Sequence, residues 1–292
     1  MGAVAGRGIA LWGPGLALLG LVFAVPLGES AWASLHRLWL QLPDEAPFVG
    51  LENYRQLVTS ARFWRALGRT AGFAAASVAL EAALGVGLAL LMHRGGPRAR
   101  AFARTTALLP WALPTAVTAV LWAWILHDRH GVANHLLLAL GAIGAPLVWL
   151  GEPTLAMASI LVADVWKTTP FVALIALAGL QTIDPRVYEA AALDGASRFQ
   201  AFRRVTLPLL RPALVVAVLF RAVEALRIFD LVYVLTRGGP GGSTETVSVL
   251  AYLLMFQELD MGQASAAGLL TAAVAGLVAA ALLGTQARAE RA

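Results

Sequence analysis

The sequence predicts an all-α polytopic membrane protein with six transmembrane helices. Hydrophobic residues make up 59% of the 292-residue chain and charged residues only 13%, whereas soluble domains carry about 25% charged residues. A spanning helix needs about 20 mostly apolar residues. Six stretches meet this requirement, at about 9–33, 69–92, 105–127, 155–179, 212–235 and 262–284. We therefore expect residues 1–292 to form a single transmembrane domain.

The arginines indicate how these helices are oriented. If the N-terminus lies inside, 12 arginines fall in cytoplasmic segments and 7 in outside segments, with two compact clusters at 94–104 and 186–211. Cytoplasmic loops of membrane proteins carry an excess of basic residues. We therefore expect both termini to be cytoplasmic in a multi-pass protein of the inner (cytoplasmic) membrane.

The first apolar stretch has an alternative interpretation. Ala31-Trp32-Ala33 resembles a signal-peptide cleavage site. However, the apolar run is longer than the 7–15 residues of a usual signal-peptide core. We expect a spanning helix here, with cleavage near Ala33 as the alternative.

Two segments are expected on the outer side. Phe48-Val49-Gly50-Leu51-Glu52-Asn53-Tyr54 predicts a turn that leads into a short amphipathic helix. Residues 244–258 are apolar but too short to span a membrane. They predict a helix that lies on the outer interface or dips into it.

Several kinds of chemistry are excluded by residue type. The chain has no cysteine, which rules out disulfides and thiolate-ligated metals. Its single lysine, Lys167, follows Val-Ala-Asp-Val-Trp and not a glycine-rich phosphate loop. The spacing of His127, His130 and His135 does not fit a compact zinc site. We expect no catalytic residue, metal site or cofactor in this chain, so ATP and Mg²⁺ would be bound by partners.

The polar segment at about 184–210 predicts a helix–turn–helix. Asp184-Pro185 is typical of a helix start, and Gly195 offers the left-handed geometry that ends the first helix after Leu193. Ser197 can cap a second helix, which Pro208 is expected to close. A loop whose arginines only set topology is the plain alternative, but such a loop needs no capped helices.

The spacing in this segment resembles a known family. Glu189-Ala190-Ala191, three residues, Gly195, nine residues and Val205-Thr206-Leu207-Pro208 are similar to the EAA loop of binding-protein-dependent ABC importer permeases. The resemblance implies the type I permease fold and a cytoplasmic coupling helix that docks on an ATPase subunit. The docking residues that it implies are Glu189, Ala190, Ala191, Asp194, Gly195, Phe199, Leu207 and Pro208.

Other segments resemble the carbohydrate branch of that family, of the trehalose and maltose class. They are Val49–Tyr54, Val165–Phe171, Arg227–Asp230 and Thr236–Pro240. The resemblance implies a di- or oligosaccharide substrate and a non-catalytic permease. It also implies three kinds of protein partner: a second permease subunit in a heterodimer, two ATP-binding subunits and an extracytoplasmic sugar-binding (lipo)protein. No nucleic acid is expected.

Ionisable residues at membrane depth are costly and are functional candidates by default. Asp164 and Lys167 lie three residues apart and can pair, and Trp166 beside them offers a face for stacking on a sugar. A second series recurs every third residue and winds across one half of the fifth stretch. It consists of Arg221, Glu224, Arg227 and Asp230.

These charged groups have two interpretations. They can be structural ion pairs between helices, which we favour for Arg221. Alternatively they line a hydrophilic pathway, for which the candidates are Asp164, Trp166, Lys167, Glu224, Arg227 and Asp230. Glu81 in the second stretch has no partner on its own helix and belongs to the same question.

Three classes of function remain to be compared. The resemblance favours one half of an ATP-driven sugar importer; permeases for glycerol phosphates or amino acids are the alternative within that class. A secondary transporter would titrate Asp164, Glu224 or Asp230, but the internal repeats of that class are not visible. An intramembrane enzyme is disfavoured because no HExxH or GxSxG motif occurs.

Overall fold

A computed structural model describes residues 2–42, 44–94, 105 and 107–289. In this part of the chain the regular structure is helical and no strand is present. The chain divides into two compact units, residues 1–64 with 250–272 and residues 65–249 with 273–292. Arg98, Arg100 and Arg104 of the predicted cytoplasmic cluster lie outside the described residues.

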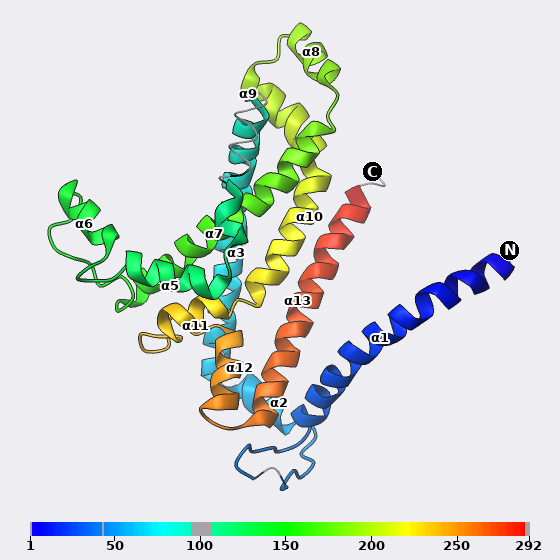
Figure 1. Cartoon of the computed structure of the whole chain (residues 1–292), viewed down its shortest axis with the longest axis vertical. Helices are drawn as coiled ribbons and strands as arrows, with labels where there is room; N and C mark the ends of the chain where they lie inside the picture. Colours follow the sequence, from blue (N-terminus) through cyan, green and yellow to red (C-terminus); the bar gives the residue numbers. More distant parts are fainter. Residues whose placement is uncertain (1, 43, 95–104, 106, 290–292) are drawn as a thin grey trace. The chain divides into compact units, whose positions relative to one another are not determined.

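The helices follow one another along the chain as Figure 1 labels them. Unit 1 contains α1 (Gly2–Ser34) and α2 (Glu52–Thr59). Unit 2 contains α5 (Thr115–Ile125), α6 (Val132–Ala139), α7 (Pro153–Gln181), α8 (Pro185–Leu193), α9 (Arg198–Ala201), the π-helical turn η1 (Phe202–Thr206), α10 (Leu207–Leu226) and α11 (Asp230–Thr236). Both units receive residues from α3 (Ala61–Arg94), α12 (Val247–Phe256) and α13 (Met261–Ala289).

Four of the predicted spans lie in long continuous helices. By length and apolar composition, Gly13–Ser34, Ala61–His93, Pro153–Gln181 and Met261–Gly284 can each cross a membrane. Two shorter apolar helices, Thr115–Ile125 and Val247–Phe256, accompany them. The second of these corresponds to the short apolar helix that was predicted between residues 244 and 258.

The predicted third and fifth spans are not single helices, which corrects the expectation for both. In the third, residues 107–112 are helical, Leu113 and Pro114 are not, and α5 starts at Thr115. Pro114 has no N–H and disfavours helical geometry at the residue before it. In the fifth, the helix ends at Leu226 and restarts at Asp230. Broken helices occur at membrane depth only where protein or a cavity satisfies the freed backbone groups.

The core of unit 2 is built around α7, which packs against α3 and α10 through small and aliphatic residues. A Cβ atom added at Gly85 of α3 would lie 2.8 Å from Cβ of Val172. One added at Gly179 of α7 would lie 2.8 Å from Cβ of Ala213 in α10. Glycine therefore permits the close approach of these helices, as is common in membrane proteins.

The start of α7 is fixed by a side-chain cap. The carboxylate of Glu152 accepts hydrogen bonds from the backbone amides of Thr154 and Leu155 at 3.2 and 2.7 Å, and Pro153 occupies the first helical turn. These amide donors lower the pKa of Glu152 below its usual range. The long helix therefore begins at a defined residue.

Unit 1 confirms the predicted turn and short helix. Gly50 has a φ of +59°, which glycine adopts readily, and α2 follows at once. The Asn53 amide donates to the carbonyl oxygens of Ser34 and His36 at 2.8 and 2.9 Å. The Tyr54 hydroxyl donates to Oγ of Ser34 at 2.8 Å. These bonds attach α2 to the end of α1.

Candidate functional site

A buried cluster of charged side chains joins three helices of unit 2. Arg221 of α10 donates through Nε and Nη2 to both carboxylate oxygens of Glu81 on α3, the Nη2 bond measuring 2.9 Å. Nη2 also lies 3.0 Å from Oδ2 of Asp164 on α7. The three residues are 3%, 0% and 7% exposed, respectively. One guanidinium thus holds two buried carboxylates, which would repel each other without it.

Two hydroxyl groups complete the cluster. Oγ of Ser77 lies 2.6 Å from Oε1 of Glu81 and 2.6 Å from Oδ2 of Asp164. The Thr168 hydroxyl contacts Glu81 at 2.6 Å and the backbone oxygen of Asp164 at the same distance. Both hydroxyls lie one helical turn from a carboxylate, because residues four apart share a helix face.

The cluster corrects two expectations. Asp164 pairs with Arg221 from another helix and not with Lys167 on its own. Glu81 has a partner on its own helix, the hydroxyl of Ser77 four residues before it. The structural role expected for Arg221 agrees with its burial and its three carboxylate contacts, the third being Glu224 at 2.7 Å.

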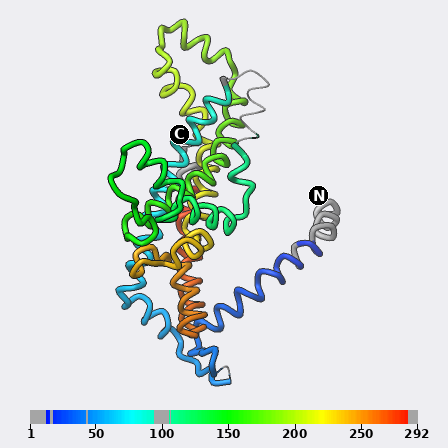
Figure 2. The backbone as a smooth tube through the Cα atoms, turned by 60° about the vertical axis from the view of Figure 1, so that its left-hand side comes forward, coloured from blue at the N-terminus to red at the C-terminus, as the bar shows by residue number. Residues whose placement is uncertain are grey.

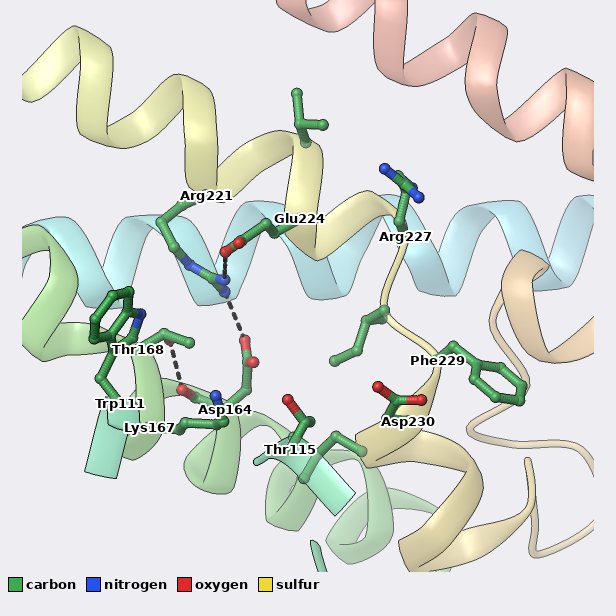
Figure 3. Close-up of a pocket in the computed structure, with 13 residues that line it drawn as sticks. Trp111, Thr115, Asp164, Lys167, Thr168, Arg221, Glu224, Arg227, Phe229 and Asp230 are labelled. Atoms are coloured by element: carbon green, nitrogen blue, oxygen red, sulfur yellow. Dashed lines mark hydrogen bonds and ion pairs between the residues drawn. The ribbon is translucent and has the colours of Figure 1, made fainter. Parts of the chain in front are cut away.

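A cavity of about 320 Å³ opens beside the cluster (Figure 3). It borders on Asp164 and Arg221, and α5, α7, α10 and α11 contribute to it. Its lining residues are Trp111, Thr115, Asp164, Lys167, Thr168, Arg221, Val223, Glu224, Arg227, Ile228, Phe229, Asp230 and Leu231. The break between α10 and α11 contributes residues 227–229 to this lining. Small-molecule sites in proteins typically have volumes of about 300–1,000 Å³.

Three charged residues of the lining have no ion pair in the part of the chain that the structure describes: Lys167, Arg227 and Asp230. In Figure 3 the carboxylate of Asp230 points toward the middle of the lining, whereas Arg227 extends away from the Arg221 cluster. The predicted winding series is therefore wrong beyond Glu224. The helix stops at Leu226. Arg227 therefore lies in a non-helical segment and Asp230 begins α11, so neither continues the face of α10 that carries Arg221 and Glu224.

The aromatic residue predicted for the pathway lies outside this cavity. Trp166 is absent from the cavity lining and packs edge-on against Trp122, with ring centroids 5.8 Å apart. Trp111 lines the cavity instead and stacks on Phe171 at 6.1 Å. Trp111, Thr115, Ser77 and Thr168 were not predicted from the sequence. Of these four, only Ser77 and Thr168 could have been found from the sequence, because each lies four residues from an acidic residue in an apolar stretch, Glu81 and Asp164 respectively.

The segment between α7 and α10 is an exposed helical excursion. Figure 2 shows it leaving the end of α7 and returning to the start of α10. The Asp184 carboxylate caps α8 by accepting a hydrogen bond of 2.9 Å from the backbone amide of Arg186. Gly195, which follows α8, has a φ of +77°. Ser197 and Gln200 form a reciprocal capping box. The predicted start of both helices and the turn between them are confirmed.

The side chains of this excursion are available to a partner. α8, which carries Glu189, Ala190 and Ala191, has no buried residue. Leu193 is 90% exposed and Phe199 is 69% exposed, and Asp194, Gly195, Leu207 and Pro208 are exposed as well. Exposed apolar residues on a capped helix pair are typical of an interaction surface.

Pro208 does not close the second helix, contrary to the expectation. α9 continues through η1 directly into α10, and Pro208 stands in the first turn of α10. In η1 the amide of Leu207 bonds the carbonyl of Phe202, five residues back. Pro208 has no N–H, so it donates no hydrogen bond to the preceding turn. The hydroxyls of Tyr188 and Thr206 lie 3.2 Å apart and join α8 to η1.

Residues 83–291 match the family described as the binding-protein-dependent transport system inner membrane component. The chain belongs to this family. The match covers Asp164 and Arg221 of the buried cluster, the cavity and the whole α8–α9 excursion. The protein is therefore a multi-pass membrane protein and a permease component of a transport system.

Curated relatives agree over most of their length. The chain is 44% identical to the trehalose/maltose transport system permease protein MalF of Thermococcus litoralis, over 86% of this chain and 84% of the relative. It is 38% identical to the sulfoquinovosyl glycerol transport system permease protein SmoG of Agrobacterium fabrum, over 88% and 83%. It is 37% identical to the trehalose transport system permease protein SugA of Mycobacterium tuberculosis, over 88% and 81%.

The fold also matches a solved structure. A chain of a bacterial ABC transporter involved in the import of the acidic polysaccharide alginate superposes with a TM-score of 0.82, at 24% identity, over 96% of this chain and 94% of that one. At this level of identity the likeness concerns the fold. It agrees with the mostly helical permease architecture that the sequence predicts.

Proposed function

We propose that this chain is the transmembrane subunit of an ATP-driven importer that passes a di- or oligosaccharide of the trehalose or maltose class. The names of its relatives support the substrate class, since those quoted above are sugar or sugar-glycerol transport permeases. The chain forms half of the translocation pathway and has no catalytic residue or cofactor of its own. ATP and Mg²⁺ are bound by separate ATPase subunits.

One observation carries the energy-coupling part of this proposal, the exposed and doubly capped α8–α9 pair. Its eight docking residues are Glu189, Ala190, Ala191, Asp194, Gly195, Phe199, Leu207 and Pro208. A helix without a buried residue contributes little to packing within its own chain, so its ordered caps are better explained by a partner. Two ATPase subunits dock here and on the matching loop of a second permease subunit.

The sugar pathway passes through the cavity beside Arg221. Donors and acceptors for the sugar hydroxyl groups come from Asp164, Lys167, Glu224, Arg227 and Asp230. The aromatic face predicted at Trp166 is offered in this cavity by Trp111. A hydroxyl-rich solute needs such polar groups, because each of its hydroxyls loses hydrogen bonds to water on entering.

The topology follows from the basic residues and the broken helices together. Six crossings place both termini and the α8–α9 pair in the cytoplasm, and the interrupted third and fifth crossings border the cavity. A sugar-loaded extracytoplasmic binding protein docks on the opposite side, on residues 34–68, 128–153 and 236–260. Alternating access between the two permease subunits then releases the sugar inward.

The test is uptake of radiolabelled trehalose and maltose into vesicles that contain the full complex with its binding protein. We expect uptake to require ATP, and Glu189→Ala and Gly195→Ala to reduce uptake at least about tenfold, because α8 loses a charged contact and its C-terminal turn is strained at positive φ. Gln181→Ala, at the exposed end of α7, is the control and should transport normally.

Uptake that persists without ATP hydrolysis and collapses with a proton or sodium ionophore would contradict the proposal and favour an ion-coupled secondary transporter. ATP-dependent uptake of a glycerol phosphate or an amino acid, with none of either sugar, would retain the importer and overturn the substrate class.

A further inference from the structure

A second depression in unit 2 lies away from the sugar cavity and has no residue of α8 in its lining, although Leu207 and Pro208 of the docking set border it. It is a groove of about 360 Å³ between α10 and α13. Its apolar floor is built from residues of α10 and from Leu282 of α13. The residues that carry the argument are Arg203, Leu207, Arg211, Val215, Val218 and Leu282.

These residues form one ordered stripe. Arg203, Leu207, Arg211, Val215 and Val218 recur every three or four positions, so they share one face from η1 through α10. Arg203 and Arg211, with Leu207 between them, stand at one end, and Val215 and Val218 stand at the other. From Arg211 to Val218 the helix rises about 10 Å, at 1.5 Å per residue. The groove thus changes from cationic to apolar along its length.

The charge of the groove is unbalanced. None of its lining residues carries a carboxylate. Arg203 and Arg211 are both exposed, and neither has an ion pair within the described residues. The two arginines lie about two helical turns apart on one face, so both long side chains can reach an anion placed between them, and such an anion would balance their charge. Guanidinium groups bind phosphate oxygens with matching geometry.

We propose that this groove binds an anionic phospholipid of the cytoplasmic leaflet. The phosphate lies between Arg203 and Arg211, and one acyl chain runs along α10 against Leu282. The placement rests on the orientation given under the proposed function, in which the α8–α9 end of unit 2 faces the cytoplasm. Basic pockets between helices on that side of a membrane are known to suit anionic headgroups. The lipid fixes the start of α10, where the docking excursion ends.

The experiment measures lipid binding to the full chain directly. The purified protein is titrated with dioleoyl phosphatidylglycerol or with dioleoyl phosphatidylcholine, and bound lipids are counted by native mass spectrometry. We expect phosphatidylglycerol to bind more tightly. Replacing both arginines (Arg203→Gln with Arg211→Gln) should weaken its binding about 30-fold, the equivalent of about 1 kcal/mol for each cationic contact.

Two further variants and one competitor make the result specific. Arg204→Gln changes an exposed neighbour outside the groove and should leave the affinity unchanged. Val215→Trp fills the acyl path with both arginines in place, and should weaken phosphatidylglycerol binding as well. Inorganic phosphate at millimolar concentration should not displace the lipid.

Three outcomes overturn the proposal. The first is equal binding of the two lipids. The second is an unchanged affinity in the double arginine variant. The third is loss of binding in the arginine variant with full competition by inorganic phosphate and no effect of Val215→Trp, which would indicate an anion site without an acyl groove. None of these outcomes depends on transport, so the proposed sugar import can stand or fail separately.

Discussion

At the level of single residues, Arg221 is the side chain on which the buried charge of unit 2 depends. It contacts Glu81 and Asp164, which come from two other helices, and Glu224 on its own helix. A buried ion pair adds little net stability compared with an apolar replacement of the whole set, but removing one partner leaves the other charge without compensation. The cluster therefore fixes how α3, α7 and α10 are registered against one another.

Replacing Arg221 with Met is expected to lower the free energy of unfolding by about 3–5 kcal/mol, because Glu81 and Asp164 remain buried without their cation. Unfolding by denaturant in detergent, followed by circular dichroism, measures this. Adding Glu81→Gln and Asp164→Asn should recover part of the loss, since neutral amides do not repel.

The matched control is Arg227→Met, an exposed arginine six residues later without an ion pair in the described part of the chain. Its change should stay within about 0.5 kcal/mol. Equal destabilisation by both substitutions would show that the effect comes from losing any arginine and not from the cluster.

At the level of elements, close helix packing and helix breaks decide the shape of unit 2. α3 and α7 approach closely at Gly85, and the break at 227–229 gives the cavity part of its wall. Trp111 and Thr115, on either side of the break at Leu113–Pro114, also line the cavity. At the second break the Thr246 hydroxyl donates to the carbonyl of Ile228 at 3.1 Å. A partner from a distant segment therefore satisfies a backbone group that the missing helical turn leaves free.

Gly85→Ala is expected to cost about 1–3 kcal/mol, because the added methyl group would meet Cβ of Val172 at 2.8 Å and must push α3 from α7. The same unfolding assay measures it. Gly87→Ala on the same helix has nothing within 4 Å and should be neutral or stabilising by up to about 1 kcal/mol.

A compensating change at Val172 tests the assigned contact. Val172→Ala combined with Gly85→Ala should lose less than the sum of the two single changes, since the second substitution opens space for the first. Strict additivity would mean that the two residues do not touch.

At the level of the whole molecule, orientation in the membrane is the property that links the site, the docking excursion and the lipid groove. It rests on the distribution of arginines, 12 against 7, and so remains a prediction. The absence of cysteine from the chain allows a clean test, because any introduced thiol is the only one present.

Leu193→Cys and Glu45→Cys place single thiols on two exposed positions, in α8 and in the segment between α1 and α2. A membrane-impermeant maleimide added to intact cells should label the second and not the first. In inside-out vesicles the pattern should reverse, because the α8–α9 pair is expected to face the cytoplasm. Labelling of Leu193→Cys in intact cells would overturn the orientation and with it the ATPase docking.

The sequence by itself determined the membrane class, the short helix after Gly50 and the capped start and turn of the α8–α9 excursion. Composition can be counted directly from the sequence, and helix caps and positive-φ glycines depend only on residues a few positions apart. These features can therefore be predicted without knowing which helices pack together. Only the tertiary structure decided the partners of the buried charges. Glu81, Asp164 and Arg221 lie up to 140 residues apart, and their pairing depends on which helices pack together. It also decided that the fifth predicted span is broken, since no Pro or Gly lies between Arg227 and Phe229 and the bond that stabilises the break comes from Thr246.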